Sequence, residues 1–209
     1  MVDLPPSRHR FVRGVNRPFR SLARALLDLE ITGVEHVPRR GPVILAANHL
    51  SHLDPVLVTS AADRAVRYLA VDELFGRSRL FDAATGFFGT IPLDRDGIPI
   101  QALRAALEHV DAGGALGVFP EGRRVRHWGE TPPRRGAAWL AWMTGAPLVP
   151  VAIRGSEGLL SVERRGLGRA SIRVWVESPL DWFDFRDHVD PVGAMTEAWR
   201  AMVDRRLAG

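Results

Sequence analysis

One histidine and one aspartate carry the first chemical signal in the sequence. His49 stands five residues before Asp54, in the run Asn48-His49-Leu50-Ser51-His52-Leu53-Asp54. An imidazole takes a proton from a hydroxyl at neutral pH, because its ordinary pKa is about 6.5. A carboxylate bound to its other ring nitrogen fixes the tautomer and stabilises the imidazolium that forms during proton transfer. The spacing therefore predicts that His49 is a general base and that Asp54 orients it.

The sequence offers no covalent nucleophile beside this pair. It contains no cysteine, and no serine stands in a Gly-x-Ser-x-Gly turn. The absence of cysteine excludes a thiol nucleophile, a disulfide and a cysteine-based zinc site. The simplest mechanism is direct attack by a substrate hydroxyl that His49 deprotonates, without a covalent intermediate.

A metal site is the alternative interpretation of the same run. His49, His52 and Asp54 place three ligating side chains within six residues, which would suit a metal-dependent hydrolase. Because this spacing is not a familiar zinc pattern, we expect no bound metal. His52 is then expected to lie at the start of a helix or to support the site indirectly.

Short strands and helices alternate from Ile31 onward. The pattern predicts an α/β fold, a single domain over residues 31–209 with a largely parallel mixed sheet flanked by helices. We predict strands over Val43–Ala47, Val66–Ala70, Thr90–Leu93, Ala115–Phe119, Leu148–Ile153 and Ile172–Val176. We predict helices over Pro55–Ala62, Ile98–Asp111, Gly136–Thr144 and Pro191–Leu207, and a loop over Arg154–Ala170.

Three polar clusters stand directly after predicted strands. They are the run around His49, then Asp94-Arg95-Asp96-Gly97, then Pro120-Glu121-Gly122-Arg123-Arg124. In open α/β sheets the binding site forms beyond the carboxyl ends of the strands. We therefore expect the active site where these clusters meet.

The first 30 residues form a separate, basic helical segment. Six of them are arginines, and apolar residues recur at spacings of three or four, which is typical of one helix face: Phe11, Val15, Phe19, Leu22 and Leu26. Pro18 predicts a break, and hence two short helices. The segment either packs on the domain or binds an anionic membrane surface through residues 8–27. The sequence leaves both interpretations open.

The charge of the chain favours acidic partners. All 28 basic residues are arginines, the net charge is +4, and guanidinium groups pair well with phosphate or carboxylate. A non-catalytic basic module is a further alternative, but no aromatic-basic recognition motif occurs, so we expect no nucleic-acid partner. No stretch of 18 uncharged apolar residues predicts a membrane-spanning helix. Without an apolar signal core at its N-terminus, the chain is expected in the cytoplasm.

Four sequence blocks resemble, in order, the motifs of the lysophosphatidic acid/glycerol-phosphate acyltransferase family. They are Asn48-His49-x-x-x-x-Asp54, Gly89-Thr90-Ile91-Pro92-Leu93-Asp94-Arg95, Phe119-Pro120-Glu121-Gly122-x-Arg124 and Val149-Pro150-Val151-Ala152-Ile153. Ala70-x-Asp72-Glu73-Leu74-Phe75 is similar to a stretch that precedes the second motif of the family. One block alone would be weak evidence, whereas four in the family's order are strong evidence.

The resemblance implies the glycerol-phosphate acyltransferase fold and a 1-acylglycerol-3-phosphate O-acyltransferase activity. A fatty acyl group would pass from acyl-CoA or acyl-carrier protein to the free hydroxyl of this lysophospholipid acceptor and give phosphatidate for phospholipid synthesis. The thioester is a co-substrate, and no cofactor is implied. Glycerol 3-phosphate, an amino-lipid and a glycolipid are alternative acceptors. The chain would lie peripherally on the inner face of the cell membrane.

The resemblance also implies residue roles. His49 would be the general base and Asp54 its partner, while Arg95 and Arg124 would bind the acceptor's phosphate. Glu121 and Gly122 would shape the acceptor site. Backbone N–H groups near these loops would stabilise the oxyanion, although the sequence does not identify them.

The third motif departs from the family pattern. Arg123, Arg124 and Val125 stand where the family usually has Thr, Arg and Ser, and the additional Arg123 is expected to contribute to substrate binding. Val71 replaces a lysine that is common before the Asp-Glu-Leu-Phe stretch. Neither change affects the histidine–aspartate pair.

Trp182, Phe183 and Phe185 form an aromatic cluster near the C-terminus. Such clusters usually contribute to packing. Packing at the sheet edge is therefore the favoured hypothesis, and an acyl-chain groove or a membrane contact is the alternative.

Overall fold

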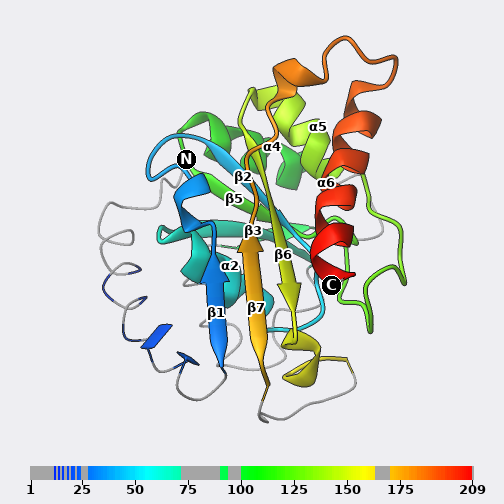
Figure 1. Cartoon of the computed structure of the whole chain (residues 1–209). Coiled ribbons are helices and arrows are strands. Elements are labelled where there is room, and N and C mark those ends of the chain that lie inside the picture. The colour runs from blue at the N-terminus through cyan, green and yellow to red at the C-terminus, as the bar shows by residue number, and fades with distance from the viewer. Residues whose placement is uncertain are drawn as a thin grey trace.

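The computed structural model describes residues 28–71, 90–93, 100–162 and 170–208, together with residues 12, 14, 16, 18, 20, 21, 23 and 24. In this part of the chain, seven strands form one sheet with helices on both faces (Figure 1). The predicted α/β architecture is confirmed.

The sheet is mixed and mostly parallel. In spatial order its strands are β1 (Leu29–Thr32), β7 (Ile172–Val176), β6 (Leu148–Arg154), β2 (Val43–Ala47), β5 (Ala115–Val118), β3 (Val66–Val71) and β4 (Ile91–Leu93). β6 and β7 pair antiparallel, and the other pairs of described strands are parallel. The carboxyl ends of β6, β2 and β5 therefore lie side by side at one edge, which we call the carboxyl edge.

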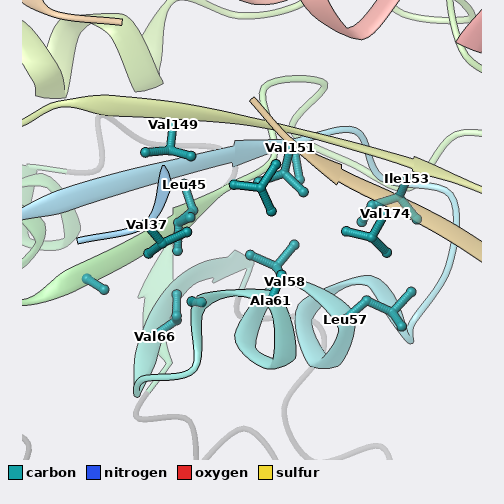
Figure 2. Packing of buried hydrophobic residues seen from close by; sticks show 14 of the residues in the cluster. Val37, Leu45, Leu57, Val58, Ala61, Val66, Val149, Val151, Ile153 and Val174 are labelled. Carbon is teal, nitrogen blue, oxygen red and sulfur yellow. The ribbon is translucent and has the colours of Figure 1, made fainter. Parts of the chain in front are cut away.

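Helices cover the two faces of the sheet unequally. α2 (Asp54–Ala62) packs on one face, and α4 (Ile100–Asp111), α5 (Gly136–Thr144) and α6 (Pro191–Leu207) pack on the other. Figure 2 shows the α2 side, where Leu57, Val58 and Ala61 point towards strand residues that include Leu45 and Val151. All of β2 is buried, as is typical of a central parallel strand covered on both faces.

α6 is fixed to the sheet by one large side chain. Trp199 is 1% exposed, and its Nε1 donates a hydrogen bond of 2.9 Å to the carbonyl of Ala46 in β2. The helix begins at Pro191 after an Asp190 cap that accepts from the Gly193 N–H at 3.0 Å. α6 thereby covers one face of β2, the strand that leads to His49.

Among the described residues, one strand was not predicted from the sequence. β1 has four residues, of which only Leu29 is buried, and it pairs with β7 far along the chain. So short and exposed a strand carries little hydrophobic periodicity, and its partner is not adjacent in sequence. It begins at Leu29 and therefore crosses the boundary drawn after residue 30. The predicted strands and helices from Val43 onward are present, and their described ends differ from the predicted ones by at most one residue. Residues 98 and 99 of the predicted helix Ile98–Asp111 and residues 163–169 of the predicted loop lie outside the described residues.

Before Asp28, the described residues of the N-terminal segment are helical, and one side of them packs on the end of α2. The amide of Asn16 donates to Asp63 Oδ1 at 3.0 Å, and Arg20 Nε donates to Ser60 Oγ at 3.1 Å. Burial lowers the pKa of Arg20. Through its hydrogen bond to Ser60, this arginine helps to hold the segment on the domain.

Other sequence predictions for this segment concern residues outside the described set. They include the apolar series from Phe11 to Leu26 and the residues on either side of Pro18, so the break at Pro18 stays a prediction. In the part of the chain that the structure describes, no helix has both the length and the apolar character needed to cross a bilayer.

The aromatic cluster lies around the 3-10 turn η4 (Trp182–Asp184). Trp182 and Phe185 pack against the core on the α4–α6 side, and the Trp182 ring lies 5.7 Å from that of Trp142. Phe183 is 65% exposed. Two of the three residues thus take part in packing.

Candidate active site

Three loops meet at the carboxyl edge of the sheet. Residues 48–53 follow β2, residues 119–125 follow β5, and residues 155–161 follow β6. The first and third predicted polar clusters are therefore brought together. The second cluster, which contains Arg95, lies outside the described residues.

His49 and Asp54 form a hydrogen-bonded pair. His49 Nδ1 lies 2.9 Å from Asp54 Oδ2, and this oxygen also accepts the main-chain N–H groups of Leu50 and Ser51 at 2.7 Å each. An ionised carboxylate only accepts hydrogen bonds, so Nδ1 carries the proton and Nε2 is left as an acceptor. The Asp54 side chain is fully buried, whereas that of His49 is 16% exposed. The arrangement leaves Nε2 of an oriented, partly exposed imidazole able to accept a proton.

The position of Asp54 follows from the local fold. It is the first residue of α2, and Pro55 follows it at a position where a proline favours helix initiation. The chain between His49 and Asp54 turns back over this helix end, so two N–H groups point at the carboxylate. These donors and the positive end of the helix dipole stabilise the buried negative charge.

Hydrogen bonds to β6 and to the loop after it also hold the loop that carries His49. The Asn48 side chain is fully buried, donates to the Ile153 carbonyl at 2.8 Å and accepts the Ile153 N–H at 2.7 Å. Ser51 Oγ donates to the Leu159 carbonyl at 2.5 Å. Asn48 received no role from the sequence, although an asparagine directly after an apolar strand and directly before the predicted base was an available signal.

The third motif surrounds His49 itself. The Phe119 ring stacks on the imidazole, with 3.9 Å between centroids and 17° between planes. Glu121 Oε1 accepts the His49 N–H at 3.2 Å, and the Val125 N–H donates to the His49 carbonyl at 2.9 Å. The sequence did not assign a role to Phe119, which stands directly after the end of β5.

Glu121 is a buried acid in this site. Its side chain is almost inaccessible, and the residue is 1% exposed. Burial raises its pKa from 4.5 to about 7, and the negative charge of Asp54 acts in the same direction. Glu121 therefore changes protonation state near neutral pH.

Gly122 closes the turn that follows Phe119. Its N–H donates to the Phe119 carbonyl at 2.9 Å, and its φ of 70° lies in the left-handed region. A Cβ at this position would also come within 3.0 Å of Arg134 Nε. Arg134 is a further basic side chain near this turn, and it was not singled out from the sequence.

The arginines of the third motif differ in their surroundings. Although His52 is exposed, shielding of its ring from water and the positive charge of Arg124 lower its pKa from 6.5 to about 4. Arg124 therefore places its positive charge close to the His49–Asp54 loop, and His52 is neutral at pH 7. Arg123 is more exposed, and its Nη2 donates to Thr131 Oγ1 at 3.1 Å and lies 3.7 Å from Glu130.

The alternative metal site requires three converging ligands. Across residues 28–71, 90–93, 100–162 and 170–208, no three His, Asp or Glu side chains are placed to hold one metal ion. The described geometry instead gives His49 Nδ1 a carboxylate partner within its own loop. The site can thus accept a proton at Nε2 beside a local positive charge from Arg124.

The chain matches one family model and is similar to several proteins named as acyltransferases. The family model is that of the Acyltransferase domain, and it matches residues 28–154. A 1-acyl-sn-glycerol-3-phosphate acyltransferase of Bacillus subtilis is 25% identical over 174 residues, which cover 81% of this chain and 83% of that protein. The alpha enzyme of that name from Mus musculus is 28% identical over 180 residues, covering 78% and 62%.

Coverage of the relatives varies. A chloroplastic 1-acyl-sn-glycerol-3-phosphate acyltransferase of Brassica napus is 26% identical over 155 residues, which are 72% of this chain and only 44% of that protein. The chain thus corresponds to less than half the length of this relative. The crystal structure of the 1-acyl-sn-glycerophosphate (LPA) acyltransferase PlsC from Thermotoga maritima has a TM-score of 0.78 at 22% identity, covering 100% of this chain and 85% of that one. This likeness shows that the two chains share a fold.

Proposed function

The chain belongs to the acyltransferase family, and we propose that it transfers a fatty acyl group from a thioester to the free hydroxyl of 1-acylglycerol 3-phosphate. The product would be phosphatidate. The observation that carries this proposal is the buried Asp54 carboxylate, 2.9 Å from Nδ1 of a partly exposed His49. The names of the relatives support the choice of acceptor, and acyl-CoA or acyl-carrier protein would supply the acyl group without a further cofactor.

The pair would act by general-base catalysis. Nε2 of His49 takes the proton of the acceptor hydroxyl while the hydroxyl oxygen attacks the thioester carbonyl carbon. Asp54 stabilises the imidazolium. The tetrahedral intermediate then breaks its carbon–sulfur bond, and the leaving thiolate takes the proton from the imidazolium. General-base assistance of this kind typically contributes about 10²–10⁴ in rate.

Arginine side chains would bind the phosphate of the acceptor. This role for Arg124 is supported by its positive charge next to His52, in the loop between His49 and Asp54. Arg95 is proposed from its place in the second motif. Arg123 is already engaged with Thr131 and Glu130, so we expect it to contribute less than Arg124. Guanidinium groups suit this role because they can bind phosphate through two hydrogen bonds at once.

The acceptor's surroundings suggest where the enzyme works. A lysophospholipid resides in a membrane, so we propose that the chain acts in the cytoplasm at the inner face of the cell membrane. Residues 8–27 would provide the contact with anionic lipid. The described part of this segment supports such a contact in one respect: its docked side is fixed to α2, while Arg24 is exposed.

The decisive experiment identifies the product. Purified enzyme would be incubated with acyl-CoA or acyl-carrier protein and a panel of acceptors, and the products would be analysed by mass spectrometry. We expect phosphatidate from 1-acylglycerol 3-phosphate, and His49→Ala should lower turnover by about 10²–10⁴-fold. His188→Ala is the matched control, because His188 is an exposed histidine beyond η4.

Other outcomes would change the proposal. Acylation of glycerol 3-phosphate, an amino-lipid or a glycolipid in preference would keep the chemistry and change the acceptor. Full activity of His49→Ala would contradict the proposed base. Inactivation by EDTA with rescue by zinc would favour the metal-dependent hydrolase.

A further inference from the structure

We propose that Glu121 is a positioning residue that holds the main chain of His49, and not a ligand of the acceptor's phosphate. This inference rests on the proposed function in one respect, the role of His49 as general base. It changes the role that the third motif implied for Glu121, which was to shape the acceptor site.

One short segment contacts His49 on three sides. The carboxylate of Glu121 accepts its N–H at 3.2 Å, the N–H of Val125 donates to its carbonyl at 2.9 Å, and the ring of Phe119 covers one face of the imidazole. Both main-chain hydrogen-bonding groups of His49 are thus taken by residues 119–125. This segment follows β5, whereas His49 follows β2, so the contacts join two neighbouring strands of the sheet.

The stacked ring is itself supported from behind. Phe119 stacks on Tyr68 with 5.8 Å between centroids, and the Tyr68 hydroxyl donates to the Pro55 carbonyl at 2.8 Å. Pro55 is the residue after Asp54. The base, its covering ring and the start of α2 are therefore fixed to one another, and Glu121 is the member that acts on the main chain of the base.

Burial separates Glu121 from any substrate phosphate. The residue is 1% exposed, and in the described part of the chain its Oε2 is buried without a hydrogen-bond partner. A phosphate carries negative charge, and an ionised carboxylate beside it would repel it. One oxygen of Glu121 already accepts the His49 N–H, and the other is buried. The side chain is therefore suited to accept a structural hydrogen bond and not to bind an anion.

The role has a kinetic signature. The direction of Nε2 depends on where the His49 main chain lies, and a displacement of about 1 Å at a reacting group can cost about 10²-fold in rate. Loss of the Glu121 acceptor should therefore lower kcat, while KM for the acceptor stays nearly unchanged because phosphate binding is not altered.

Two substitutions at Glu121 separate the possible roles. Glu121→Gln keeps an oxygen that accepts the His49 N–H but cannot ionise, and we expect kcat within about threefold of the unmodified enzyme. Glu121→Ala removes the acceptor, and we expect kcat to fall by about 10–100-fold with KM changed less than about threefold. Glu108→Ala, an exposed glutamate on α4, is the matched control and should leave both constants unchanged. Circular dichroism and thermal unfolding establish that each variant is folded.

Several results would overturn the inference. A folded Glu121→Gln that is as impaired as Glu121→Ala would show that the carboxylate charge is required. An effect of Glu121→Ala on KM alone would make Glu121 a substrate ligand, and unchanged kcat would remove the positioning role. If Glu121→Ala does not fold, Glu121→Gln and Phe119→Leu decide the matter, since the latter should also lower kcat and not raise KM.

The outcomes also distinguish this inference from the proposed function. Inactive His49→Ala together with fully active Glu121→Ala would leave the general base in place and reject only the positioning role. Fully active His49→Ala would reject the general base whatever the Glu121 variants do.

Discussion

Opposite edges of the sheet each bury a charged side chain held by the main chain. At the edge where β2, β5 and β3 begin, Arg64 is 4% exposed and donates to the carbonyls of Pro38, Gly41 and Gly113, each at 2.9 Å. At the carboxyl edge, Asp54 is fully buried and accepts two main-chain N–H groups from its own loop. Arg64 connects separate loops at its edge, whereas Asp54 organises the single loop that carries His49.

The two charges differ in what else they hold. The partners of Arg64 are carbonyl oxygens, which do not exchange protons, and these bonds connect the loops before three strands. Asp54 also binds the His49 ring, which is partly exposed and has a second nitrogen able to accept a proton. Burial of a charge therefore indicates a structural constraint at either edge. Only at the carboxyl edge does the buried charge also orient a partly exposed titratable group, His49, and this difference points to chemistry at that edge.

Neutralising the charge at the carboxyl edge should have the largest effect on activity. Asp54→Asn should lower kcat/KM by about 10³–10⁴-fold, because an amide cannot fix the His49 tautomer or stabilise its imidazolium in the same way. The acyl-transfer assay would measure this loss, and Asp111→Asn, at the exposed end of α4, is the control. Nearly full activity in a folded Asp54→Asn protein would contradict the proposed role of Asp54.

Removing the charge at the opposite edge should change stability and not chemistry. Arg64→Met leaves three main-chain carbonyls without their donor, so we expect the free energy of unfolding to fall by about 2–4 kcal/mol. The kcat of the folded fraction should stay within about twofold. Urea unfolding followed by circular dichroism measures the first quantity, and Arg104→Met, an exposed arginine on α4, is the control. Unchanged stability would mean that these hydrogen bonds contribute nothing net.

A third buried group gives a smaller, pH-dependent test. The folded-state pKa of Glu121 is about 7 against an ordinary 4.5, so between these values the folded protein binds more protons than the unfolded chain. Stability from this group is therefore highest below pH 4.5 and falls as the pH rises to about 7. Glu121→Gln lacks this penalty and should be more stable than the unmodified protein by about 1–3 kcal/mol above pH 7.

The measurement for Glu121 compares unfolding free energies of the two proteins at several pH values. Below about pH 4.5 the advantage of Glu121→Gln should disappear, because the carboxyl is then protonated in both states. Glu108→Gln should show no such trend, since Glu108 is exposed. An advantage of Glu121→Gln that is the same at all pH values would contradict the assignment.

Local patterns predicted the parts of the site that are close in sequence. His49 and Asp54 are five residues apart on either side of a turn into a helix, so their contact depends mainly on local structure and little on the packing of distant segments. The apolar runs that form β2, β5 and β6 were also readable, because strands covered on both faces are continuously hydrophobic. β1 lacked such a run, and its register with β7 depends on a partner far along the chain.

The third motif shows where local patterns end. The sequence placed Glu121, Gly122, Arg123 and Arg124 together after β5, but it could not say which of them turn inward. In the structure Glu121 is buried and accepts the His49 N–H, while Arg123 points to Glu130 in its own loop. That loop is fastened to α6 by Trp128, whose Nε1 donates to Asp204 Oδ1 at 2.5 Å.

By itself, then, the sequence determined an α/β domain with a histidine–aspartate pair and a basic motif after neighbouring strands. Only the tertiary structure decided that Phe119, Glu121 and Val125 close around His49 and that Asn48 binds Ile153. The physical reason is that these contacts require the spatial order β6-β2-β5. That order is set by simultaneous burial of both faces of β2 against α2 on one side and α4, α5 and α6 on the other.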